Sequence, residues 1–142
     1  MAEHNDVGRI GEDLAAKELR KRGFSIRERN YRLGNIEIDI IAENKTTLVF
    51  VEVKTRTTTF ANVQPEEFVD DRKKRFMIVA GNGYIRHNHI EKQLRYDIIG
   101  ILLDRQCHEI KELHYFENAF APKLRTRNAL SFSSEWRWHR KR

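Results

Sequence analysis

The sequence predicts an α/β domain in which one mixed β-sheet is flanked by helices, in the order helix, three strands, helix, two strands (αβββαββ). Two observations carry this prediction. Two segments place their apolar residues at helical spacing, and five others are rich in β-branched residues, alternating or continuously apolar. The connections between the first three strands are short, which favours an antiparallel meander. A chain of 142 residues is long enough to bury a core of its own.

The first helix is predicted over about residues 6–22. Asp6 suits the N-cap position. Apolar residues follow at helical spacing: Val7, Ile10, Leu14, Ala15 and Leu19. The basic segment 20–22 suits the negative end of the helix dipole, and Gly23 suits the position after the last turn.

Three consecutive strands are predicted over residues 24–31, 36–42 and 48–54. The first alternates and is strongly basic, and the third is the most β-prone stretch of the chain. Turns at 33–35 and 43–46 separate them. A threonine-rich loop over 55–63 follows.

The second helix is predicted to open at Pro65, with Glu66 and Glu67 in its first turn. Its apolar stripe consists of Phe68, Val69, Phe76, Val79 and Ala80. The glycines of segment 81–83 are expected to break or kink it. Residues 94–103 read as a central strand buried on both faces, and 109–116 as an edge strand.

The net charge of +6 comes entirely from the end of the chain. Residues 1–117 hold 20 basic and 20 acidic side chains, whereas 118–142 hold seven basic residues and one acidic residue. We therefore expect a domain over 1–121 and a basic tail over 122–142. The tail is attracted to polyanions such as nucleic acid. Alternatively, it is a solubilising, disordered end.

Composition also bounds the location of the protein. No apolar run approaches the roughly 20 residues of a membrane helix, and the N-terminus lacks a signal pattern. Cys107 is the single cysteine, so neither an internal disulfide nor a cysteine zinc cluster can form. These features predict a cytoplasmic protein without a membrane partner.

Strand geometry brings three charged side chains together. Residues i and i+2 of a strand point to one face, about 6.6–7 Å apart. Glu52 and Lys54 therefore share a face, and Asp39 of the preceding strand is expected across the hairpin from Glu52. Buried carboxylates are costly unless they are paired or bind a cation.

This trio predicts a magnesium-dependent site that cleaves phosphodiester bonds. The Asp39 and Glu52 carboxylates suit Mg²⁺, with the backbone carbonyl of Val53 as a third ligand; Mn²⁺ is an alternative ion at such an oxygen-rich site. The metal would polarise the scissile phosphate. Lys54 would orient the attacking water or stabilise charge on the phosphate. A Glu-x-Lys pair alone is most often a solvated ion pair, so the acid on the neighbouring strand is essential to the prediction.

The motifs around these residues resemble the YraN family of the PD-(D/E)xK nuclease superfamily. The similarity spans about residues 7–121 and rests mainly on segments 30–32, 37–42 and 49–56. Further matches are Gly8, Gly11, Glu12, Ala15, Lys73, the Arg95-Tyr96-Asp97 run and the segment 117–120. The resemblance implies a restriction-endonuclease-like fold close to archaeal Holliday junction resolvases, with Asp39, Glu52 and Lys54 at the active-site positions. It also implies a homodimer, because junction resolvases act as dimers. Ile36 departs from the family glycine, which excludes a glycine-only backbone there.

Several other residues are candidates for the same site. Glu12 lies at the edge of the apolar stripe of the first helix, and related resolvases place a helical glutamate near the metal. Lys73, Arg56 and Arg32 are candidate phosphate contacts; for Lys73 the alternative is a solvated helix face. Glu37 either supports the site or faces solvent.

Other conspicuous residues are assigned structural or solvent-exposed roles. Asp97 is expected to be a hydrogen-bonded acid at the start of a strand. The histidines of His87-x-His89 are expected on a loop, without a zinc role. For Trp136 and Trp138 of the tail three alternatives stay open: they stack nucleic-acid bases, pack on the domain or remain mobile.

The leading hypothesis is a metal-dependent endonuclease acting on DNA, on a branched or otherwise structured form. Two alternatives stay open. One is a nucleic-acid-binding module that keeps the fold without turnover. The other is an interaction partner in DNA processing that docks through its tail.

Overall fold

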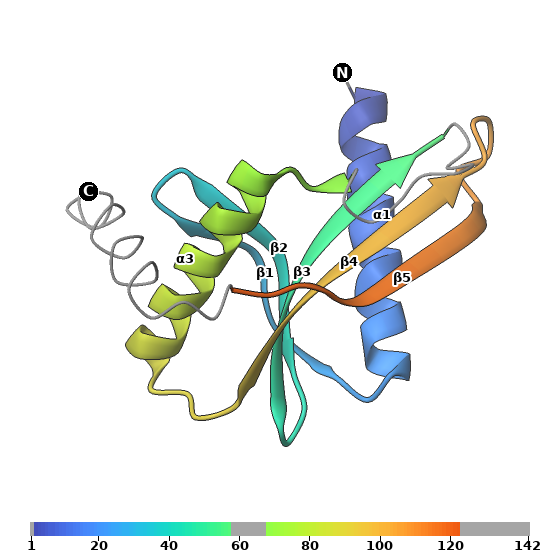
Figure 1. Ribbon diagram of the computed structural model, residues 1–142. Helices are drawn as coiled ribbons and strands as arrows, with labels where there is room; N and C mark the ends of the chain where they lie inside the picture. Colours follow the sequence, from blue (N-terminus) through green and yellow to red (C-terminus); the bar gives the residue numbers. More distant parts are fainter. Residues whose placement is uncertain (1, 58–67, 123–142) are drawn as a thin grey trace.

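In the computed structural model, residues 2–57 and 68–122 form a single mixed sheet with a helix on each face (Figure 1). The strand order is β1-β2-β3-β4-β5. The elements are α1 (Ala2–Lys21), β1 (Ser25–Leu33), β2 (Ile36–Glu43), β3 (Thr47–Arg56), α3 (Asp71–Asn88), β4 (Gln93–Leu103) and β5 (Ile110–Phe120). The predicted α/β class and the order of helices and strands are confirmed.

Strand pairing follows the length of the connections. β1 pairs with β2, and β2 with β3, in antiparallel fashion through short turns. β3 and β4 run parallel, because the chain crosses back through α3 before β4 begins. β5 pairs antiparallel with β4 and forms one edge of the sheet, as predicted for that segment.

The sheet separates two layers of core. On the α1 face, Ala15 and Leu19 of α1 pack with Val49 and Val51 of β3. On the α3 face, the cluster is larger and contains Leu48, Phe50, Met77, Tyr84, Tyr96 and Ile98. Because strand residues alternate, Glu52 continues the row of Leu48 and Phe50 on the α3 face.

Helix α1 begins earlier than predicted, at Ala2 instead of residue 6. Its C-terminus is as predicted. Gly23 has a φ of 92°, and the backbone N–H of Phe24 donates to the Leu19 carbonyl at 3.0 Å. A left-handed residue therefore ends α1 and turns the chain into β1.

The predicted start of the second helix is not the start of α3. Pro65, Glu66 and Glu67 lie outside the described residues, and Asp70 is extended, with φ −76° and ψ 171°. The Asp70 carboxylate accepts from the backbone N–H of Lys73 at 2.8 Å. This N-cap interaction starts the helix at Asp71 instead.

The predicted break at residues 81–83 is wrong, because α3 continues through the glycines to Asn88. Gly81 lies against the sheet, where an added Cβ would be 2.6 Å from the Tyr96 hydroxyl and 3.0 Å from the Phe50 ring. This glycine therefore serves close packing. The helix ends at His89, whose φ is 53° and whose N–H donates to the Ile85 carbonyl. His87 accordingly lies in the last turn of α3 and not on a loop.

Within the described part of the chain, neither helix combines the length and apolar character that crossing a bilayer requires. Residues 123–142, with Trp136 and Trp138, lie outside the described residues. The predicted boundary between domain and tail stays a prediction.

Candidate active site

The candidate site begins where β2 and β3 separate. Their pairing ends at Ile40 and Val51, so Asp39 and Glu52 are the first facing residues beyond the ladder. Asp39 Oδ2 accepts a hydrogen bond of 2.8 Å from the backbone N–H of Val53. A carboxylate thus replaces the next rung of the ladder, which brings it to β3 as the sequence predicts.

Glu52 is the buried member of this pair, with only 5% of its surface exposed. Lys54 Nζ lies 3.8 Å from Glu52 Oε2, and Lys73 Nζ of α3 lies 3.7 Å from Oε1. Neither ammonium is within hydrogen-bonding distance. Among the described residues, Glu52 Oε1 is a buried oxygen with no hydrogen-bond partner. Such an atom is costly to bury and marks a place where a ligand can bind.

Burial dominates the electrostatics of the two carboxyls. It raises the pKa of Asp39 to about 7, helped by the adjacent Glu52 and opposed by the Val53 N–H and by Lys73. Burial also raises the pKa of Glu52, and Lys73 and Lys54 partly offset that rise. Two neighbouring carboxyls that resist ionisation together are stabilised when a cation binds between them.

Glu12 of α1 approaches Asp39, the member of the pair that it influences electrostatically. Burial raises the pKa of Glu12, and the nearby Asp39 adds to the rise, while Arg29 opposes it. Arg29 of β1 contacts Glu12 at 3.5 Å and Asp13 at 2.8 Å. The sequence prediction that Glu12 lies near the site is consistent with this geometry.

A glycine allows α1 to come this close. A Cβ on Gly11 would be 1.8 Å from Oγ1 of Thr55, so the helix backbone rests directly on β3. Thr55 follows the catalytic candidates on the same strand. Gly11 therefore sets how closely α1, and with it Glu12, approaches the sheet.

The donors present fit a hard divalent cation. The Val53 N–H points toward β2. Because the N–H and C=O of one strand residue point to the same side, the Val53 carbonyl faces the gap between the strands as well. Two carboxylates and a carbonyl are oxygen ligands of the kind that Mg²⁺ binds. In the described residues, no group of three or more His, Cys, Asp or Glu side chains forms a metal cluster, so water or substrate oxygens would complete the shell.

The predicted phosphate contacts lie at different distances from this centre. Lys73 reaches the centre, because its ammonium lies 3.7 Å from Glu52 Oε1. The same ammonium donates to the backbone carbonyl of Glu37 at 3.5 Å. Arg56 is exposed at the end of β3. Arg32 lies near the β1–β2 turn and pairs with Glu37 at 3.5 Å. Glu37 therefore contacts Arg32 through its side chain.

Asn30 belongs to the matched segment 30–32 but was not among the predicted site residues. Asn30 has a φ of 54°, unusual for a non-glycine residue inside a strand. The Asn30 side chain lies close enough to Glu12 to lower the pKa of that carboxyl, against the rise that burial causes. The signal in the sequence was weak: asparagine is among the few residues that tolerate this conformation.

The prediction that Asp97 is a hydrogen-bonded structural acid is confirmed, although Asp97 lies within β4 and not at the start of a strand. Its side chain is fully buried and accepts from the Arg95 guanidinium at 2.9 and 3.0 Å. The Tyr115 hydroxyl and the backbone N–H of Asn118 also donate to it. Through this network, Asp97 of β4 holds the edge strand β5 in place.

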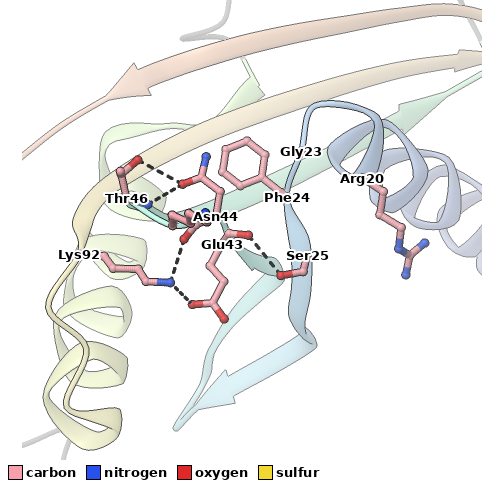
Figure 2. Close-up of a pocket in the computed structure, with 9 residues that line it drawn as sticks. Arg20, Gly23, Phe24, Ser25, Glu43, Asn44, Thr46 and Lys92 are labelled. Atoms are coloured by element: carbon pink, nitrogen blue, oxygen red, sulfur yellow. Dashed lines mark hydrogen bonds and ion pairs between the residues drawn. The ribbon is translucent and has the colours of Figure 1, made fainter.

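A pocket of about 810 Å³ lies at the other end of the sheet, at the start of β3 (Figure 2). Glu43 Oε1 and the Asn44 carbonyl both accept from Lys92, at 2.7 and 2.8 Å. Asn44 in turn accepts from Thr46. These polar groups satisfy one another across a turn, so the pocket lacks the unpartnered carboxylate that distinguishes the Asp39–Glu52 centre.

Known proteins resemble this chain over most of its length. The model of a family described as "Uncharacterised protein family UPF0102" matches residues 11–101. A UPF0102 protein of Porphyromonas gingivalis is 43% identical over 122 residues, covering 84% of this chain and 87% of the relative. One of Flavobacterium psychrophilum is 42% identical over 120 residues, covering 84% and 98%.

Two solved structures resemble the fold at low scores. An XisH family protein from Nostoc punctiforme has a TM-score of 0.37 and 16% identity, covering 73% of this chain and 98% of that chain. A fdxN element excision controlling factor protein from Anabaena variabilis has a TM-score of 0.33 and 16% identity, covering 67% and 90%.

Proposed function

This chain belongs to the uncharacterised protein family UPF0102, and we propose that it is a metal-dependent endonuclease that hydrolyses DNA phosphodiester bonds. The family is the one whose motifs the sequence resembles under the name YraN. The observation that carries the proposal is the buried pair of Asp39 and Glu52 at the separation of two strands. In the part of the chain that the structure describes, one oxygen of this pair has no hydrogen-bond partner.

The chemistry of the donor set supports Mg²⁺ as the cofactor, with Mn²⁺ as a substitute. Asp39, Glu52 and the Val53 carbonyl would hold the ion. When bound, such an ion supplies positive charge to the phosphate and to a nearby water. The site would otherwise keep two carboxyls in an environment that raises the pKa of both.

The lysines supply the remaining charge. Lys54 is half-exposed on the same face as Glu52, so its ammonium can meet a water or a phosphate oxygen at the surface of the site. Its role in the proposal is to orient the attacking water or to stabilise negative charge on the phosphate. Lys73 and Arg56 would contact the flanking phosphates, which adds affinity without sequence preference.

Branched or otherwise structured DNA is the proposed substrate, on the strength of the family resemblance. Symmetric cutting of a junction needs two sites, so this substrate implies a homodimer. The competing function is a module that binds nucleic acid through the same basic residues without turnover. Dependence on a divalent cation separates the two.

The decisive experiment is a cleavage assay with the purified full chain on four-way junction, flap, single-stranded and duplex DNA. Each substrate is incubated with Mg²⁺, Mn²⁺ or EDTA, beside a Glu52→Gln variant. We expect metal-dependent cutting that this variant loses while it still binds DNA. Salt-sensitive binding without cutting on every substrate would instead favour the binding module.

A further inference from the structure

In β1 and β2, the side of the sheet to which alternate residues point changes at the same level, beside the site. In β2, Ile36 and Ile38 pack on the α3 face, whereas Ile40 and Ala42 pack on the α1 face. A regular strand would keep Ile38 and Ile40 on one side. The alternation of β2 is therefore interrupted at Asp39.

β1 shows the matching interruption. Arg29 reaches Glu12 and Asp13 of α1, whereas Tyr31, two residues on, packs against Tyr84 of α3 with ring centroids 5.0 Å apart. Between them lies Asn30, with its φ of 54°. The pairs Arg29–Ile40 and Tyr31–Ile38 flank it, which puts Asn30 directly across from Asp39.

We propose that Asn30 is a positioning residue of the metal site, whose left-handed backbone and side-chain amide together hold Glu12 toward Asp39. This inference rests on the proposed function and extends it to a residue with no assigned role. The backbone at Asn30 turns Arg29 toward α1, where its guanidinium lies 3.5 Å from Glu12, and the nearby Asn30 amide favours the ionised form of that carboxyl. Glu12 is thereby held between two donors and presented to the centre.

Substitution of Asn30 by glycine distinguishes a role of the backbone conformation from a role of the side-chain amide. Glycine adopts a φ near 54° without strain, so Asn30→Gly keeps the backbone and removes only the amide. Asn118 of β5 provides a matched control, since its φ is 52° and it lies two strands from β3. Asn118→Gly makes the same chemical change away from the site.

The experiment measures thermal unfolding, Mg²⁺ affinity by titration calorimetry, and the Mg²⁺ concentration for half-maximal cutting. For Asn30→Gly we expect an unchanged melting temperature, metal affinity about three- to tenfold weaker, and a nearly unchanged rate at saturating Mg²⁺. Asn30→Asp, which cannot donate to Glu12, should raise the Mg²⁺ concentration for half-maximal cutting at pH 8 at least as much. Asn118→Gly should match the wild type in every assay.

Three outcomes would overturn the inference. An unchanged metal requirement in Asn30→Gly would remove the role of the amide while leaving the nuclease proposal intact. If Asn118→Gly changed the Mg²⁺ requirement as much as Asn30→Gly, the effect would come from general strand stiffness and not from the amide of Asn30. A wild-type chain that neither binds Mg²⁺ nor cuts DNA would overturn the proposed function, and this inference with it.

Discussion

The backbone N–H of Val53 donates a 2.8 Å hydrogen bond to the side chain of Asp39, at the level where β2 and β3 stop pairing. One contact therefore serves two purposes. It satisfies a strand N–H that has lost its ladder partner, and it fixes a carboxylate beside Glu52.

Replacing Asp39 with asparagine should separate folding from metal binding. The amide oxygen can still accept from Val53, so the strand junction survives, but the site loses one of its two anionic ligands. We expect Mg²⁺ affinity and cutting to fall by at least about a hundredfold, equivalent to about 2.7 kcal/mol. Calorimetry and single-turnover cleavage check this. Wild-type cutting by Asp39→Asn would remove Asp39 from the site.

The metal-free protein should lose stability as the pH rises from about 4 to 7. Asp39 has a pKa of about 7 in the folded chain and an ordinary value of 3.8, so the folded state holds the proton where the unfolded state has released it. The contribution is complete below about pH 4 and is lost by about pH 7, with an upper limit of about 4 kcal/mol.

Chemical denaturation in EDTA across this range measures that loss. Asp39→Asn is the control, because its side chain does not titrate, and its unfolding free energy should be flatter between pH 4 and 7. Added Mg²⁺ should restore stability to the wild type at pH 8, since it binds the ionised folded state. A wild-type profile as flat as that of the control would contradict the assignment of this titration to Asp39.

Removing the Lys73 ammonium should destabilise the metal-free chain. Lys73→Met leaves the buried Glu52 with Lys54 as its remaining lysine neighbour within 4 Å. The expected cost is about 1–3 kcal/mol, because the buried Glu52 carboxyl loses one of the two ammonium groups that lie within 4 Å of it. Lys74→Met is the matched control, because Lys74 pairs at 3.8 Å with Asp71, which is 89% exposed. Equal losses in both variants would show that Lys73 acts only as a helix-surface residue.

Adding a methyl group at Gly11 should displace Glu12 from the site. The Cβ of Gly11→Ala would overlap Oγ1 of Thr55 at 1.8 Å, so α1 must move away from β3. We expect lower thermal stability together with weaker Mg²⁺ binding. A second change, Thr55→Gly, removes the overlapping side chain and should recover part of both losses.

Gly8→Ala provides the control for this pair. It lies one turn earlier in α1 with nothing within 4 Å of an added Cβ. It should raise stability by up to about 1 kcal/mol, because alanine favours the helix. If Gly11→Ala behaved in the same way, the close contact between α1 and β3 would not control the position of Glu12.

Local periodicity explains what was predictable from the sequence. Alternation along residues 48–54 was enough to put Glu52 and Lys54 on one face, and short polar turns were enough to give the antiparallel meander. The motif around residues 49–56 indicated the family, and the family model confirms it. These features depend on residues close together in the chain, so they can be read along it.

The features that the sequence did not predict depend on the tertiary structure. Gly81 looked like a helix breaker, yet the helix continues because Phe50 and Tyr96 need that space. Lys73 was a candidate phosphate contact, but nothing in its own segment placed it beside Glu52, where α3 brings it. The left-handed turn at Asn30 interrupts an alternation that the sequence pattern assumed to be regular. For Gly81 and Lys73 the determining atoms come from another element, and a pattern within one segment does not contain them.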